Sequence, residues 1–187
     1  NAEPVIERTD VNSVGAVLPA DAKVVAGSCW TGSIAVDRPS AWRCMVGNEI
    51  HDPCFTTTAS KDELVCDLDP VSNKPGFILK LTKPLPDTGN KTSGGSPWIL
   101  KLVNDAVCRP YTGTMPMTDK GAISYYCEGS SEKTGATKDC ETGLLEGSVK
   151  EGKVWTVTQV TFCSAPQAKT GISTRKVEEV PVKTVWQ

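Results

Sequence analysis

The chain has 187 residues, of which 39% are hydrophobic and 22% charged, a composition typical of a globular protein that buries a substantial core. Its 20 basic and 22 acidic residues give a formal net charge of −2, which argues against nucleic acid or anionic lipid as a partner, because both require clustered Lys and Arg. The apolar runs are far shorter than the roughly 20 residues that span a bilayer, so we expect no membrane insertion.

The N-terminal stretch, residues 1–21, has apolar side chains spread thinly before the first cysteine. We expect an N-terminal arm here, either disordered or exchanged as a strand with another copy. The chain begins with Asn1 rather than Met, which favours a mature protein whose targeting segment has been removed.

Short β-branched or aromatic runs, separated by Gly, Pro, Asn and Asp, dominate the chain, and no segment keeps a helical apolar period. The clearest predicted strands are 22–27, 76–82, 97–103, 122–127 and 153–163. In two of them apolar residues alternate with more polar ones, as in a strand with one buried face. The prediction is an all-β, disulfide-stapled antiparallel β-sandwich or barrel-like domain at 22–163, with extended termini.

The stretch WRCMVGNEIHDPCF, residues 42–55, contains two cysteines and the chain's one histidine, so a metal site is one hypothesis. Cys44, His51 and Cys54, with Glu49 or Asp52, would supply the ligands. The five cysteines that remain are an odd number and would need another explanation. We therefore expect no metal and no other cofactor.

A catalytic site is the second hypothesis for this stretch, with His51 as a general base oriented by Asp52, or with Glu49 and Asp52 as paired carboxylates. No nucleophile signature accompanies the histidine. Gly47, Asn48, Asp52 and Pro53 are favoured in turns, so the stretch is more typical of strand, turn, strand. We expect His51 to be structural or at the surface, and we predict no catalytic residues.

The loop 83–97 is rich in Pro, Gly and Ser and is either a surface excursion or a linker between subdomains. One domain is the favoured interpretation. Asn90 begins an Asn-Lys-Thr sequon, which matters only in a eukaryotic secretory pathway.

Several of these segments resemble parts of uncharacterised secreted bacterial domains. The resemblance rests on Trp42, Arg43, Cys44, Gly47, Asn48, Asp52, Pro53, Cys54 and Phe55, and on PGFILKLTKPLP, PWILKL, AVCRP and GKVWT, within residues 29–157. It implies an exported bacterial protein and brings no activity or binding residue. Cys140 and Cys163 are additions to this pattern. Two cysteines that are added together are what a disulfide bond between them would require.

The eight cysteines include no C-x-x-C pair, which argues against a zinc ribbon or a thioredoxin-like site and favours disulfides. Sequence alone leaves many connectivities open. Sequential pairing is favoured because each pair brackets one turn and two strand-like flanks. The cysteines are Cys29, Cys44, Cys54, Cys66, Cys108, Cys127, Cys140 and Cys163.

The C-terminal segment, 164–187, ends in an alternating stretch that predicts a half-buried strand. Pro181 lacks a ladder donor and places this strand on a sheet edge. The strand either closes the protein's own sheet or completes that of a neighbouring subunit. Its proposed assembly residues are Val180, Val182, Thr184 and Trp186.

These features favour an exported, extracellular or cell-surface protein that is not an enzyme and acts as the subunit of a self-assembly, such as a filament or surface layer, joined by its terminal strands. The alternative is an extracellular module that binds carbohydrate or peptide through exposed aromatic side chains. The candidate aromatic residues are Trp30, Trp42, Tyr111, Tyr125 and Tyr126. A secreted hydrolase is the third hypothesis.

Overall fold

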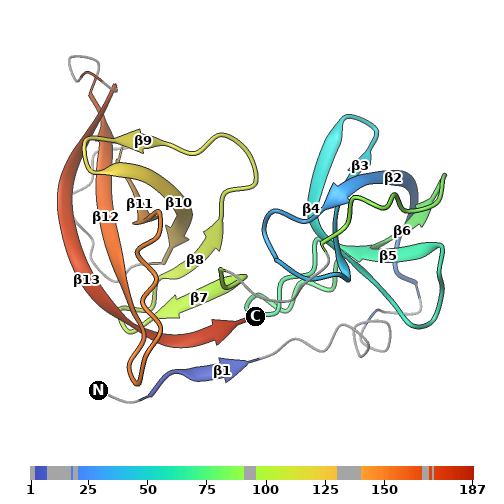
Figure 1. Cartoon of the computed structure of the whole chain (residues 1–187), viewed down its shortest axis with the longest axis horizontal. Helices are drawn as coiled ribbons and strands as arrows, with labels where there is room; N and C mark the ends of the chain where they lie inside the picture. The colour runs from blue at the N-terminus through green and yellow to red at the C-terminus, as the bar shows by residue number, and fades with distance from the viewer. Residues whose placement is uncertain are drawn as a thin grey trace. The chain divides into compact units, whose positions relative to one another are not determined.

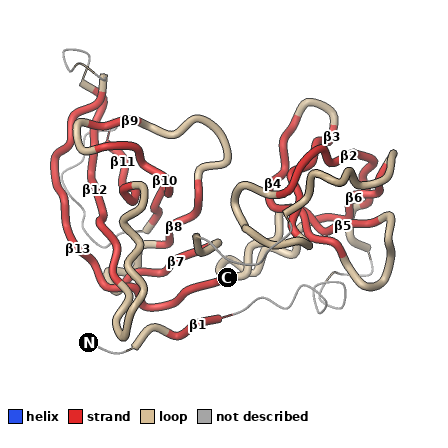
Figure 2. Tube along the Cα trace, viewed as in Figure 1, coloured by secondary structure: helices blue, strands red, loops and turns tan. Residues whose placement is uncertain are grey.

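The structure is a computed structural model that describes residues 3–7, 18, 21–90, 96–129, 140–165, 169 and 171–187. Every helix or strand assigned among these residues is a β-strand, so the predicted all-β class is confirmed (Figure 2). No described segment forms a helix suited to crossing a membrane. The five strands predicted from the sequence overlap β2, β6, β7, β10 and β12 of Figure 1.

The chain divides into two compact units. Unit 1 combines Asn1–Arg8 with Pro97–Gln187, and unit 2 comprises Thr9–Ser96. This division differs from the single domain at 22–163, and it falls at the end of the 83–97 loop that composition marked as a possible linker. The difference arises because both chain ends pair within unit 1 instead of flanking a separate core.

Unit 2 is a closed five-stranded barrel, ordered β2-β3-β4-β5-β6. Consecutive strands pair antiparallel, and a parallel pair between β2 and β6 closes the barrel. Its core contains four cysteines and three large apolar side chains: Cys29, Cys44, Cys54, Cys66, Trp42, Leu64 and Leu79. The strands are β2 (Val24–Gly32), β3 (Ala41–Val46), β4 (Glu49–Thr56), β5 (Glu63–Cys66) and β6 (Phe77–Leu81).

Unit 1 is an eight-stranded sheet, ordered β1-β13-β12-β11-β10-β8-β7, in which β9 pairs with β10 and β13 also pairs with β7. That last pairing closes the run from β13 to β7 into a ring, while β1 is an additional strand paired with β13. The strands are β1 (Val5–Glu7), β7 (Ile99–Leu102), β8 (Val107–Pro110), β9 (Met117–Thr118), β10 (Gly121–Glu128), β11 (Cys140–Leu145), β12 (Thr156–Ser164) and β13 (Ile172–Trp186).

The long strand β13 closes unit 1 by changing partners along its length. Residues 172–181 pair with β12, and residues from Val182 to Trp186 pair with β7. Pro181 lies where the change occurs, and its carbonyl accepts a 3.1 Å hydrogen bond from the Val103 N–H. A residue without an N–H is tolerated at such a point because the ladder changes direction there.

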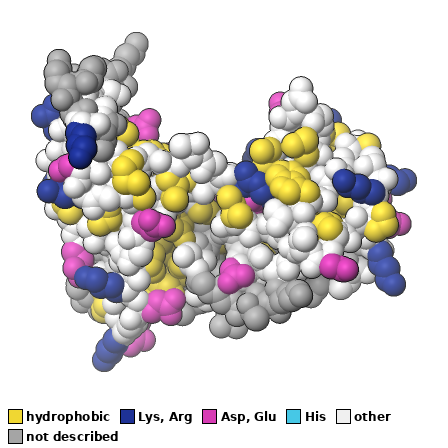
Figure 3. Space-filling model, turned by 45° about the horizontal axis from the view of Figure 1, so that its top comes forward, with side chains coloured by type: hydrophobic (Ala, Val, Ile, Leu, Met, Phe, Trp, Pro, Cys, Tyr) yellow, Lys and Arg dark blue, Asp and Glu magenta, His cyan; other side chains and the backbone are white. Residues whose placement is uncertain are grey.

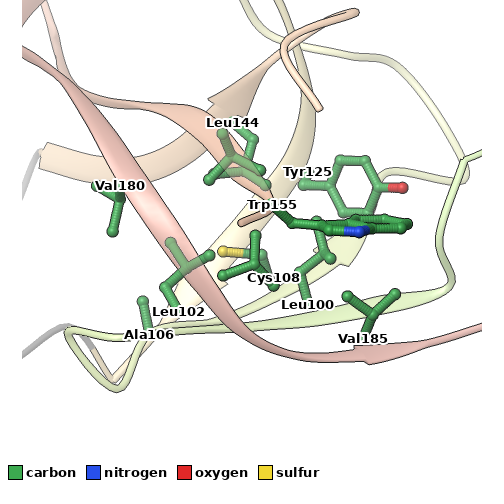
Figure 4. Packing of buried hydrophobic residues seen from close by; sticks show 11 residues of the cluster. Leu100, Leu102, Ala106, Cys108, Tyr125, Leu144, Trp155, Val180 and Val185 are labelled. Atoms are coloured by element: carbon green, nitrogen blue, oxygen red, sulfur yellow. The ribbon is translucent and has the colours of Figure 1, made fainter. Parts of the chain in front are cut away.

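The core of unit 1 lies inside this closed sheet, and Figure 4 shows its side chains pointing toward one another from β7, β8, β10, β11 and β13. Trp155, which precedes β12, packs among them and is 6% exposed. The Tyr125 hydroxyl donates a hydrogen bond to the Pro97 carbonyl, so this buried ring also satisfies its polar atom. The remaining members are Leu100, Leu102, Ala106, Cys108, Leu144, Val157, Val180, Val182 and Val185.

Candidate functional site

All eight cysteines form disulfides, and the pairing is sequential: Cys29–Cys44, Cys54–Cys66, Cys108–Cys127 and Cys140–Cys163. Each bond joins residues directly opposite one another on paired antiparallel strands, so each one fixes the register of a single strand pair. The bridged loops have sequence separations of 15, 12, 19 and 23 residues. By loop entropy, each bond of this kind stabilises the fold by about 3 kcal/mol.

The proposed metal ligands of the 42–55 stretch are not brought together as one site. Cys44 and Cys54 belong to two different disulfides, so neither offers a free thiolate in this oxidised chain. His51 instead contacts carboxylates: its Nδ1 is 2.9 Å from Asp67 Oδ1, and its Nε2 is 4.0 Å from Glu49 Oε2.

The catalytic hypothesis, which was not the favoured one, required Asp52 to orient His51, but the ring contacts Asp67 instead. Asp67 is 16 residues further along the chain and adopts a positive φ of 57° just after β5. The ring of Phe77 meets the imidazole edge to face, with centroids 5.0 Å apart. His51 therefore packs as a structural side chain that is only 11% exposed.

The predicted turn at Asp52 and Pro53 was also wrong. Both residues lie within β4, with a cis peptide bond between them, and the turn of this hairpin is formed by Gly47 and Asn48. Gly47 has a positive φ of 58°, which favours glycine. This two-residue turn sets the hairpin register and places Met45 opposite Ile50.

Asp52 is the centre of a buried polar network. Its side chain is fully buried, and its Oδ2 accepts a 2.8 Å hydrogen bond from Arg43 Nη1 and a 3.2 Å bond from the Ile34 N–H. Its Oδ1 accepts a hydrogen bond from the Ser33 hydroxyl. The network pairs the buried carboxylate with the guanidinium of Arg43, so neither charge is left uncompensated.

The loop that follows β2 is fixed to the same network. The hydroxyl oxygen of Ser33 accepts hydrogen bonds of 3.1 and 2.9 Å from the backbone N–H groups of Ala35 and Val36. The amide of Asn90 donates to the carbonyls of Ser33 and Val36, at 2.9 and 3.2 Å. Asn90 thus has a structural role, while the other two sequon residues, 91 and 92, lie outside the described part of the chain.

Trp30 is a solvent-exposed residue that contacts this network through Arg43. Its side chain is 38% exposed, and the Arg43 guanidinium carbon lies 5.6 Å from the ring centroid, a cation–π arrangement. Trp30 is also at an irregularity in the β2–β3 register, between the pairs of Cys29 and Thr31. A bulge of this kind re-aims a side chain, and this one directs an indole outward.

Exposed aliphatic side chains lie on the strands next to Trp30, since Met45 is opposite Ser28, two residues before Trp30. Met45 and Ile50 are cross-strand partners on β3 and β4 and are 39% and 49% exposed. Met45 lies two residues from Arg43 and therefore shares its side of the strand. We call Trp30, Arg43, Met45 and Ile50 the Trp30 face. Figure 3 shows hydrophobic side chains at the surface of the molecule, including unit 2.

The other candidate aromatic residues differ in exposure. Trp42 and Tyr125 are core residues, 7% and 3% exposed, and are unavailable to a ligand. Tyr111 and Tyr126 are partly exposed in unit 1 and pack edge to face, with ring centroids 5.5 Å apart. Of the five candidates, Trp30 is the most exposed.

The Tyr111 hydroxyl lies 3.5 Å from Glu141 Oε2. Partial burial of the phenol, together with the negative charge of Glu141, raises the pKa of Tyr111 above its ordinary value. The hydroxyl is therefore a stable hydrogen-bond donor at neutral pH, and its partner is Glu141.

The proposed assembly residues are placed inside unit 1. Val180, Val182, Thr184 and Trp186 are between 1% and 9% exposed. The predicted edge strand was wrong: residues 184–186 pair with β7 on one side and with β1, in parallel, on the other. The strand closes the protein's own sheet, which was the other possibility left by the sequence. Within the N-terminal arm, β1 is the one strand among the described residues.

No protein-family model, curated protein or solved structure matches this chain. Sequence reasoning missed Arg43, Ser33, Met45 and Ile50 as components of a site. A signal for three of them was present, because a two-residue turn at 47–48 places Met45 opposite Ile50 and Arg43 near Asp52.

Proposed function

We propose that this chain is an exported, non-enzymatic interaction protein whose unit 2 binds a protein ligand on the Trp30 face. Four disulfides are compatible with an extracellular location. The observation that carries the proposal is an exposed tryptophan whose ring contacts Arg43 of a largely buried ion pair, with two exposed aliphatic side chains on the neighbouring strands.

The anchor is organised before a ligand arrives. Arg43 supports the Trp30 ring, and Asp52 fixes Arg43 with a 2.8 Å bond. A side chain that is already ordered loses little conformational freedom on binding, whereas an unsupported one would cost about 0.5 to 1.5 kcal/mol. Trp and Arg are also the residue types that dominate binding energy at protein interfaces.

The surroundings favour a protein ligand over a carbohydrate. Met45 and Ile50 present aliphatic surface and offer no hydrogen bonds to sugar hydroxyls. Asp52 is fully buried, and its oxygens already accept hydrogen bonds from within unit 2. Exposed apolar neighbours on a fixed sheet surface are typical of a protein interaction site.

The proposal keeps the interaction role inferred from the sequence and changes the interface. Assembly through the C-terminal strand required its apolar side chains to need a partner, and Val180, Val182 and Trp186 are buried within unit 1. A second copy of the chain is one protein ligand that the Trp30 face could accept. Sedimentation velocity of the purified chain tests that case directly.

A random peptide library displayed on phage tests the proposal. We expect the native chain to select apolar peptides whose affinity falls at least about tenfold in Trp30→Ala, in line with an interface anchor. Tyr126→Ala, in the aromatic pair of unit 1, is the matched control and should leave affinity unchanged. Peptides that bind Trp30→Ala as tightly as the native chain would refute the site. Binding of cellohexaose or chitohexaose that depends on Tyr126 would instead support a carbohydrate module.

A further inference from the structure

The two disulfides of unit 2 lie close together inside the barrel. Their four cysteines lie on four neighbouring strands, β2 to β5, and none is more than 1% exposed. The Sγ atoms of Cys44, Cys54 and Cys66 are all within 4.8 Å of one another. The fourth, Cys29 Sγ, is bonded to Cys44 Sγ at 1.98 Å.

Reduction of both disulfides would leave four thiols close enough to converge on one zinc ion after small shifts. Zinc binds thiolate sulfur at about 2.3 Å in tetrahedral geometry, which separates the sulfurs by about 3.8 Å. Cys44 Sγ lies within 4.8 Å of the sulfurs of Cys54 and Cys66, so it needs to approach each of them by no more than about 1 Å. The bonded sulfurs of Cys54 and Cys66 must separate once their disulfide is reduced. Cys29 must likewise separate from Cys44 and turn toward the other two sulfurs. We propose that unit 2, when its two disulfides are reduced, binds one Zn²⁺ through these four cysteines.

The chemistry balances with a trialkylphosphine as the reductant. For each disulfide, the phosphine and one water become phosphine oxide and two thiols, so the sulfurs gain two electrons and two protons. Zinc then displaces one proton from each of the four thiols, because thiolate is the ligand form. In the oxidised chain, the two disulfides link β2 to β3 and β4 to β5. In the reduced chain, one zinc ion would make the same two links.

Unit 1 supplies a matched control with the same number of cysteines. Its two disulfides also join neighbouring strands. Among the described residues, which include all eight cysteines, three sulfurs within 4.8 Å of one another occur in unit 2 and not in unit 1. The proximity of the sulfurs in unit 2 therefore predicts selective metal binding by that unit, whereas binding by any four thiols predicts no difference between the units.

Anaerobic titration of the reduced full-length chain with Co²⁺ tests the proposal. We expect one equivalent to bind, with sulfur-to-cobalt charge transfer and the visible bands of tetrahedral cobalt, and one equivalent of Zn²⁺ to displace it. Replacing the four unit 1 cysteines by serine should preserve this spectrum. Replacing the four unit 2 cysteines should weaken cobalt binding at least about a hundredfold, since fewer soft ligands converge.

Two results would overturn the proposal. One is the absence of stoichiometric cobalt binding by the reduced native chain, which requires no variant to fold. The other is equal affinity in the two serine variants, because unfolded chains with four thiols would then explain the binding. Cys54→Ala in the reduced native chain gives a further check, and it should lower the affinity at least about tenfold.

Discussion

Replacing Asp52 by Ala should destabilise unit 2 more than any change at the protein surface. The substitution removes the acceptor of the 2.8 Å bond from Arg43, whose side chain is only 14% exposed. Breaking a buried ion pair by removing one partner costs about 3 to 5 kcal/mol. Arg43 retains some contact with water, so we expect the lower end, about 3 kcal/mol. For a unit of this size that corresponds to a fall in Tm of at least about 12 °C.

Hydrogen exchange followed by mass spectrometry assigns the effect to one unit. Asp52→Ala should speed exchange in peptides covering 41–56 and leave those covering 156–164 unchanged. The matched control is Glu179→Ala, which breaks a 3.2 Å pair with Lys150 whose side chains are 58% and 64% exposed. That change should cost less than about 1 kcal/mol. Equal losses of unfolding free energy from the two substitutions would refute the claim that the buried pair of Arg43 and Asp52 stabilises unit 2 beneath Trp30.

Deleting residues 177–187 should unfold unit 1, because β13 closes its sheet; near-native circular dichroism with loss of a large species would instead restore the strand-addition hypothesis. His51→Ala should lower the free energy of unfolding by about 1 kcal/mol, since it removes an edge-to-face ring contact, and denaturant titration showing no change would contradict this packing. Tyr111 should ionise at a higher pH than an ordinary tyrosine, whose pKa is 10.0. The contribution of the protonated phenol to stability is therefore fully present below pH 10.0 and is lost as the pH rises through the pKa of Tyr111 in the folded chain. Ultraviolet titration should show this pKa falling in Glu141→Gln, and an unchanged pKa would refute the charge interaction.

The disulfide pairing could be predicted because it is local. Each bond joins two strands that pair with one another, and its cysteines are 12 to 23 residues apart in the sequence. Turn signals between the cysteines indicate that the flanking strands pair. The Asp67 partner of His51 could not be found in the same way. It requires β4 and β5 to be adjacent and Asp67 to adopt a positive φ, which are features of the folded barrel.

The C-terminal strand shows where sequence patterns mislead. Alternating Val180, Val182 and Thr184 indicates one buried face, and Pro181 favours an edge. The pattern does not reveal that one strand can leave β12 and join β7 at the proline. The Trp30 face was hidden for a related reason. An exposed tryptophan and a core tryptophan occupy similar sequence contexts, and the folded barrel is what distinguishes Trp30, which is 38% exposed, from Trp42, which is 7% exposed.

Hydrogen exchange of a complex between the native chain and a library-selected peptide tests the proposed site most directly. Binding should slow exchange in residues 28–32, 43–46 and 49–52, the segments that carry the Trp30 face. Exchange in residues 121–128, which carry Tyr126, should not change. Protection confined to 121–128, with none around Trp30, would show that the ligand binds elsewhere and would refute the proposed site.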